Sequence, residues 1–172
     1  MSEANPNQPG ADILIVDDDW MNRELLEAYL KMAGFSTRSA ENGEQALLLA
    51  RAQPPDLVLL DLRLPGIDGH EVCRQLKASE ATCFTPVLVI SALEADDERQ
   101  QALDSGADDF LSKPYNPLIL LARVRSLLRI SQLHQAQEWR ARRLRDVLER
   151  YVAPDVAAQI LADLGEDDNS SR

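Results

Sequence analysis

The chain has 172 residues, enough for one domain with a sizeable core and an additional segment. Acidic residues outnumber basic ones by 29 to 18, and residues 1–116 alone hold 21 acids against 9 Lys and Arg. An acidic surface repels phosphate backbones, so we expect no direct contact with nucleic acid. Cys73 and Cys83 fit neither a CxxC pair nor a zinc spacing. We find no signal peptide and no apolar run long enough to cross a membrane, so we expect a cytoplasmic protein without membrane contact.

Short apolar runs alternate with helical patterns along the chain. The runs predict strands over 13–16, 57–60 and 87–90 and a short last strand over 109–111, while the polar stretch 36–40 predicts a second, more exposed strand. The helical patterns cover 20–33, 44–52, 70–78 and 96–105, with a further helix from Pro117. In the first helix, helical spacing relates Met21, Leu25, Ala28, Tyr29 and Met32. The alternation predicts an α/β fold, a flavodoxin-like doubly wound five-stranded parallel sheet of order 2-1-3-4-5 with an extended C-terminal helix.

The C-terminal helix shows two successive patterns. Its first part carries an apolar stripe of Leu118, Leu121, Val124 and Leu128, and neither Gly nor Pro interrupts the chain before Pro154. Beyond the stripe, alternating heptad a and d spacing relates Ile130, Leu133, Gln137, Arg140, Leu144, Val147 and Tyr151. Both a weak coiled coil and a solvated, Arg-rich amphipathic helix fit this spacing.

Five polar residues stand at or just beyond the ends of predicted strands: Asp17, Asp18, Asp61, Ser91 and Lys113. Parallel strands place their carboxyl ends at one edge of the sheet, so we expect these side chains to meet there. Adjacent carboxylates repel each other and prefer a hard cation such as Mg²⁺. A carboxylate can also act as a nucleophile and form an aspartyl phosphate, while an ammonium, a hydroxyl and Mg²⁺ neutralise the phosphoryl oxygens.

Plainer roles exist for each residue alone. An Asp or Ser after a strand often caps a helix, as we expect of Asp19 for the helix that begins at Trp20. Taken alone, Lys113 is expected to be a solvated surface lysine. Their joint placement after four strands is hard to obtain by capping, and therefore favours a shared site.

The sequence around these residues resembles the receiver domains of bacterial two-component response regulators. Four motifs carry the resemblance over roughly residues 12–130: Ile-Val-Asp17-Asp18, Leu-Leu-Asp61 through Pro65 to Gly69, Val-Ile-Ser91-Ala92, and Phe110-Leu-Ser-Lys113-Pro114. They occur in the family's order with compatible spacing. As a set they are far more specific than any one of them.

The resemblance implies a role for each matching residue. Asp61 would accept a phosphoryl group from a sensor histidine kinase or a phosphotransfer protein. Asp18 and Asp61 would bind Mg²⁺ directly, Asp17 mostly through water, and Arg63 through its backbone carbonyl. Lys113 and Ser91 would contact the phosphoryl oxygens. At the switch-aromatic position, Phe110 would turn inward as Ser91 moves, although a plain core role is also open, and the Lys113–Pro114 bond would often be cis.

The composition of the chain and the resemblance together indicate a domain plan. We expect a disordered N-terminus (1–10), a receiver (11–130), an extended helix or coiled-coil linker (131–151), a short helix leading to an absent output domain (152–164) and a disordered tail (165–172). The linker end, from Tyr151 to Leu161, resembles the entry helix of class III nucleotide cyclases. A homodimer through the face formed by the helix at 96–105, the strand at 109–111 and the helix from Pro117, and through the C-terminal helix, would transmit the signal.

Other functions remain open from the residues alone. A stand-alone receiver would act as a phosphorylation-dependent protein-binding module. A hydrolase of the haloacid dehalogenase type needs a second Asp two residues after the nucleophile, but position 63 is Arg. No helix-turn-helix segment follows Pro117, which disfavours a transcription factor. We therefore expect no enzyme activity beyond self-phosphotransfer and autodephosphorylation in this chain.

Overall fold

The computed structural model describes residues 10–92 and 96–151, and its fold is the predicted one. Five strands form a parallel sheet in the order β2-β1-β3-β4-β5. The strands are β1 (Asp12–Val16), β2 (Ser36–Ala40), β3 (Leu57–Leu60), β4 (Val87–Ser91) and β5 (Asp109–Ser112). The helices between and after them are α1 (Trp20–Met32), α2 (Gly43–Ala52), α3 (Gly69–Ala78), α4 (Asp96–Asp104) and α5 (Pro117–Tyr151).

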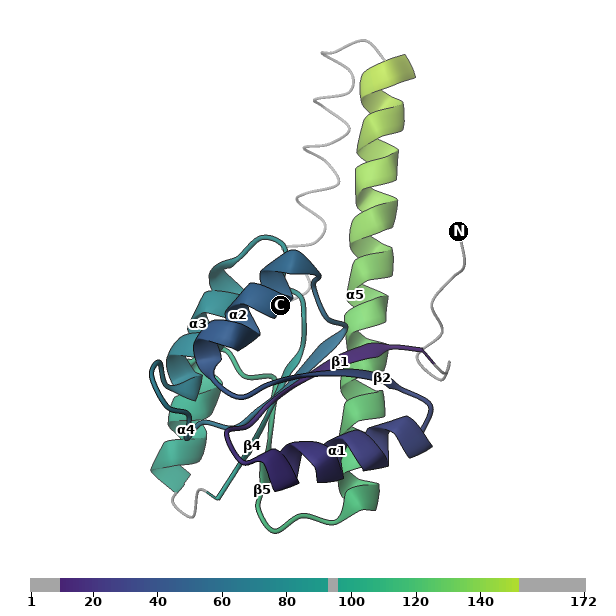
Figure 1. Ribbon diagram of the computed structural model, residues 1–172. Helices are drawn as coiled ribbons and strands as arrows, with labels where there is room; N and C mark the ends of the chain where they lie inside the picture. Colours follow the sequence, from purple (N-terminus) through teal and green to yellow (C-terminus); the bar gives the residue numbers. More distant parts are fainter. Residues whose placement is uncertain (1–9, 93–95, 152–172) are drawn as a thin grey trace. The chain divides into compact units, whose positions relative to one another are not determined.

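Two apolar layers hold the sheet, one on each face, because successive strand residues point to opposite sides. Ile13 and Ile15 of β1 pack in the layer that contains α1 and the first turns of α5. Leu14 and Val16 pack in the other layer, with α2, α3 and α4. Figure 1 shows α1 beside the sheet on one face and α2, α3 and α4 grouped on the other. The helices on both faces leave the carboxyl ends of the strands as the edge where polar groups can gather.

The first helix is where it was predicted, but most of the apolar residues that revealed it do not face the core. The buried residues of α1 are Leu26 and Leu30. Met21, Leu25 and Met32 are 59%, 45% and 88% exposed. With the exposed Ala28 they form one apolar stripe, which we call the α1 stripe. Leu26 and Leu30 lie on nearly the opposite side of the helix from this stripe. Two apolar faces therefore share one helix, and spacing alone does not tell which of them meets the sheet.

Local turn and cap residues explain several helix ends. Asp19 caps α1 as predicted, since its carboxylate accepts a hydrogen bond of 2.9 Å from the Met21 amide. Gly34 follows the helix with a φ of +90°, a conformation that favours glycine. The peptide bond between Lys113 and Pro114 is cis, as the resemblance implied.

The last helix continues to Tyr151 without a break, in agreement with the predicted extended helix. Val124 and Leu128 of its expected stripe are buried, whereas Leu118 is 75% exposed and Leu120 is buried in its place. The chain divides into two compact units, 1–132 and 133–172. The segments predicted at 152–164 and 165–172, and all of 1–10 except Gly10, lie outside the described residues. None of the described helices is both long and apolar enough to span a membrane.

Candidate functional site

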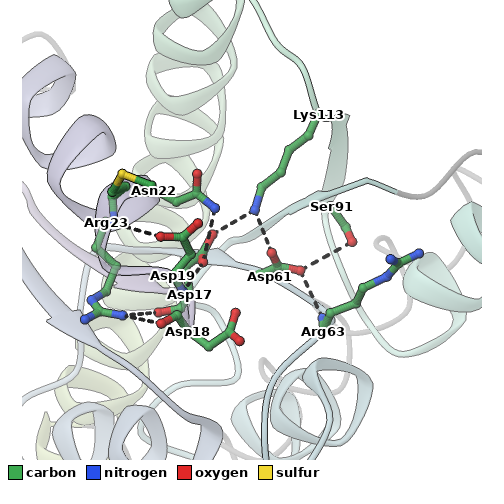
Figure 2. Close-up of polar contacts among 10 residues, drawn as sticks. Asp17, Asp18, Asp19, Asn22, Arg23, Asp61, Arg63, Ser91 and Lys113 are labelled. Carbon is green, nitrogen blue, oxygen red and sulfur yellow. Dashed lines mark hydrogen bonds and ion pairs between the residues drawn. The ribbon is translucent and has the colours of Figure 1, made fainter.

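The pairing of the strands brings the predicted polar residues to one edge. Val16 lies opposite Leu60 in the neighbouring strands β1 and β3, so Asp17 and Asp61 leave the sheet side by side. On the other side of β3, Ser91 ends β4, and its carbonyl accepts a hydrogen bond of 2.9 Å from the Lys113 amide. Figure 2 shows Asp17, Asp61, Ser91 and Lys113 linked by one chain of polar contacts. We call this group, together with Asp18, the acidic rim.

Lys113 joins the two inner carboxylates and is not a solvated surface lysine. Its Nζ donates hydrogen bonds of 2.8 Å to Asp17 Oδ2 and 2.6 Å to Asp61 Oδ2. Asp17 is only 2% exposed and Asp61 9%. Burial works against the charged form of Lys113, but the hydrogen bonds and negative charges of both carboxylates outweigh it and raise the pKa of the lysine above its usual value. The ammonium therefore stays charged at neutral pH.

Asp61 is oriented by donors on both of its oxygens. While Oδ2 accepts from Lys113, Oδ1 accepts from the Arg63 amide at 2.9 Å and from the Ser91 hydroxyl at 3.3 Å. Ser91 is fully buried, so its short side chain has a fixed direction. The Asp61 side chain nevertheless keeps 10% of its surface exposed. A carboxylate that is fixed in place and still reachable from solvent suits a nucleophile.

The two acids that follow β1 differ in their surroundings. Asp17 Oδ1 accepts from the Asp19 amide at 2.9 Å and from the Asn22 amide group at 3.4 Å, in addition to the Lys113 contact on Oδ2. Asp18 is exposed, and no described residue donates a hydrogen bond to its carboxylate. Asp18 thus has its carboxylate oxygens available for a ligand from solvent.

These donors fit a cation that keeps much of its water. Within the described residues, no group of three or more His, Cys, Asp or Glu side chains is arranged to hold a metal. Mg²⁺ needs no such group, since it commonly takes one or two carboxylates, further oxygens and several waters. The open Asp18 carboxylate and the partly exposed Asp61 carboxylate are donors of the right kind. The site chemistry is therefore consistent with Mg²⁺.

Asn22 and Arg23 belong to the site but were missed in the sequence. Arg23 Nη1 donates to the Asp17 carbonyl at 2.6 Å and to the Asp18 carbonyl at 3.1 Å. Both residues lie in the first turn of α1, and helical side chains lean back toward the N-terminus of their helix. That rule, applied to the turn after the Asp19 cap, would have pointed to them.

Phe110 lies in the core, next to the rim strand. It pairs with Val89 across β4 and β5, is 6% exposed and packs in the layer that contains α4. The Arg99 guanidinium of α4 lies 5.2 Å from the centre of its ring. The ring therefore already points inward in this structure and connects β5 to α4.

The sequence and the structure have clear relatives. Residues 13–125 match the response regulator receiver domain family. The response regulator PleD of Caulobacter vibrioides is 45% identical over 131 residues, which cover 74% of this chain and 29% of PleD. The phosphate regulon transcriptional regulatory protein PhoB of Pseudomonas aeruginosa is 42% identical over 120 residues, 70% of this chain and 52% of PhoB.

Among solved structures, the BeF3-activated N-terminal receiver domain of Klebsiella pneumoniae RstA is similar, with a TM-score of 0.65 and 35% identity. The similarity covers 69% of this chain and 98% of that domain. The chain therefore belongs to the response regulator receiver domain family, the receiver class of two-component systems. It spans 29% of PleD and 52% of PhoB, so these relatives extend well beyond the matched part.

Proposed function

We propose that the chain is a cytoplasmic phospho-accepting receiver in which Asp61 takes a phosphoryl group from a phosphohistidine. The observation that carries this proposal is the Lys113 ammonium, held within 2.8 Å of Asp17 and 2.6 Å of Asp61. An Asp61 oxygen attacks phosphorus, the P–O bond forms, and the P–N bond to the donor imidazole breaks. The electron pair of that bond returns to the imidazole nitrogen. Lys113 stays close enough to neutralise the charge that arrives with the phosphoryl oxygens.

The reaction would require Mg²⁺ at the acidic rim. Asp18 and Asp61 would hold the ion directly, Asp17 through water, and Arg63 through its carbonyl, as the resemblance implies. When bound, the ion would supply positive charge beside the phosphoryl oxygens. Ser91, whose hydroxyl is 3.3 Å from Asp61 Oδ1, would turn its hydrogen bond from the carboxylate to the phosphoryl group.

The α1 stripe supports a protein as the phosphoryl donor. Met21 is two residues from the Asp19 cap, so the stripe begins beside the acidic rim and runs along α1 to Met32. An apolar face this exposed is best explained by a partner that covers it. We propose that an apolar helix face of the sensor kinase or phosphotransfer protein packs on this stripe and brings its phosphohistidine to Asp61.

The output would run through α4, β5 and α5. The Arg99 guanidinium on the Phe110 ring connects α4 to β5, and Ser91 lies in the strand that pairs with Phe110. A groove of about 540 Å³ lies along β5 and α5, lined by the exposed Leu118, Ile119 and Ile130 and by the Arg123–Asp109 ion pair. We propose that phosphorylation changes a homodimer contact on this face.

The plan of the longer protein is part of this proposal. Residues 11–130 would be the receiver, and 131–151 a linker helix that pairs with the same helix of a second copy. The short helix 152–164 would lead to an output domain, and we propose a nucleotide cyclase for it. The chain itself would only accept and lose its own phosphoryl group. The alternative is a stand-alone receiver that binds a partner when phosphorylated. Truncation after Leu128 separates the two: if phosphorylation-dependent dimerisation survives unchanged, the helix beyond Leu128 does not transmit the signal.

The central experiment is phosphorylation by a small donor. Incubation with acetyl phosphate and Mg²⁺ should add the mass of one phosphoryl group in an acid-stable, base-labile form. Asp61→Asn should abolish this gain. Asp68→Asn is the matched control, because Asn still caps α3 in place of the carboxylate that accepts from the Glu71 amide. If the Asp61→Asn protein were phosphorylated like the wild type, Asp61 would not be the acceptor.

A further inference from the structure

We propose that Arg23 is a positioning residue for the divalent cation, because it fixes the backbone that carries Asp17 and Asp18. This inference rests on the proposed Mg²⁺ site of the acidic rim. Arg23 would not touch the ion. It would act by setting the direction in which Asp18 presents its carboxylate.

Among the described residues, the contacts of Arg23 go to main-chain oxygens and to no carboxylate. Its Nη1 lies 2.6 Å from the Asp17 carbonyl and 3.1 Å from the Asp18 carbonyl. Hydrogen bonds from a charged donor are stronger than neutral ones. One guanidinium nitrogen thus ties two consecutive peptide groups to the first turn of α1. Figure 2 shows the guanidinium on one side of this loop and the Asp18 carboxylate turned away from it.

Asp18 needs this support more than Asp17 does. Lys113, the Asp19 amide and Asn22 fix both carboxylate oxygens of Asp17. No described residue donates to the Asp18 carboxylate, so only its backbone fixes the direction of this side chain. If the backbone that carries a ligand carboxylate is mobile, it must become ordered when the ion binds. The conformational entropy lost in that ordering weakens binding. Arg23 would supply the order in advance.

Charge alone would act in the opposite direction. A guanidinium beside a cation site repels the cation, so an Arg that acted only through its charge would weaken metal binding. Removing the side chain would then tighten binding. Positioning predicts the reverse, namely that the metal binds more weakly without Arg23. The sign of the change in affinity separates the two causes.

The test measures cation affinity directly. The Kd of the unphosphorylated protein for Mn²⁺ is obtained from the electron paramagnetic resonance signal of the free ion, and Mg²⁺ competition gives the Mg²⁺ affinity. We expect Arg23→Leu to weaken binding about tenfold, the size seen when residues supporting metal ligands are removed. Arg23→Lys keeps a charged donor and should recover most of the affinity. Arg23→Gln keeps a donor without the charge and should bind less tightly than the wild type.

Arg38→Leu is the matched control. Arg38 also donates to two carbonyls, those of Leu49 and Gln53, and pairs with Asp12 at the opposite end of β1. The Arg38→Leu variant should have a lower melting temperature than the wild type and the same Kd for Mn²⁺. Unchanged or tighter binding in both Arg23→Leu and Arg23→Gln would overturn the positioning role while leaving the metal site intact. If the wild type bound no Mn²⁺, the proposed site and this inference would both be wrong.

Discussion

Lys113 Nζ lies 2.6 Å from Asp61 Oδ2, which joins the residue after β5 to the residue after β3. The same ammonium is 2.8 Å from Asp17 Oδ2, so one cation balances two carboxylates that are almost out of contact with water. Breaking a buried ion pair by removing one partner leaves the other charge uncompensated. Several consequences of this arrangement can be measured.

Lys113→Met should destabilise the protein and impair phosphorylation. The free energy of unfolding in urea should fall by about 3 kcal/mol, since Asp17 and Asp61 are left without their cation. Adding Asp17→Asn removes one of the two stranded charges and should restore part of the loss. A double variant no more stable than Lys113→Met would mean that Asp17 and Lys113 are not energetically coupled.

The Lys113 contact should also make stability depend on alkaline pH. The pKa of Lys113 is raised in the folded protein, so the ammonium's contribution is fully present below the unfolded pKa, near 10.5. It is lost as pH rises through the higher folded pKa. Unfolding of the wild type and of Lys113→Met, measured from pH 8 to 12, should show a stability difference that narrows only above about pH 10.5. A difference that narrowed already at neutral pH would contradict this assignment.

The two cysteines should differ sharply in reactivity. Burial raises the pKa of the Cys73 thiol to about 11, whereas Cys83 is only half-buried. Because the thiolate is the reactive form, a thiol reagent at pH 8 should modify Cys83 first and Cys73 only after unfolding. Mass spectrometry of peptides from native and urea-treated protein measures this. Cys83→Ser should leave the native protein almost unmodified, and rapid labelling of that variant would show that the core around Cys73 opens.

Donor docking on the α1 stripe predicts a selective loss. Met21→Ser combined with Leu25→Ser should slow phosphotransfer from autophosphorylated histidine kinases by about tenfold, because roughly 1.4 kcal/mol of apolar contact is removed. Phosphorylation by acetyl phosphate should not change, since this donor needs no docking. Leu48→Ser on α2, at a position 67% exposed, is the control. Equal slowing by the control and the stripe variant would speak against docking on α1.

Gly69 gives a test of how closely the loop after Asp61 packs. A Cβ at this position would lie 2.5 Å from Leu62 Cα and 2.6 Å from the Asp61 carbonyl oxygen. Backbone atoms must then move, and overpacking of this kind typically costs about 1–3 kcal/mol. Gly69→Ala should therefore lower the melting temperature and slow phosphorylation of Asp61 together. A Gly69→Ala variant that is phosphorylated at the wild-type rate would show that this loop can shift without displacing the Asp61 carboxylate.

The sequence was most informative where a residue stands at a strand end. Apolar runs predicted the strands that end before Asp17, Asp61, Ser91 and Lys113, and parallel pairing then placed these residues together without knowledge of any contact. The exposed side of α1 could not be predicted, because spacing reveals that Met21 and Leu25 share a face but not which face meets the sheet. Arg23 was missed in the sequence for a different reason. Its partners are carbonyls, which every residue has, so no sequence motif marks them, and only the lean of first-turn helical side chains toward the N-terminus of α1 points to Arg23.

The unequal surroundings of Asp17 and Asp18 affect how fast a bound ion can be exchanged at the site. Asp17 is built into the protein by several hydrogen bonds, whereas Asp18 has none on its carboxylate among the described residues. An ion held as proposed would leave when water replaces the Asp18, Asp61 and Arg63 oxygens around it, while the frame of hydrogen bonds from Lys113 to Asp17 and Asp61 stays closed. Ion exchange and frame opening are then separate events with separate rates, and only the second requires the fold to move.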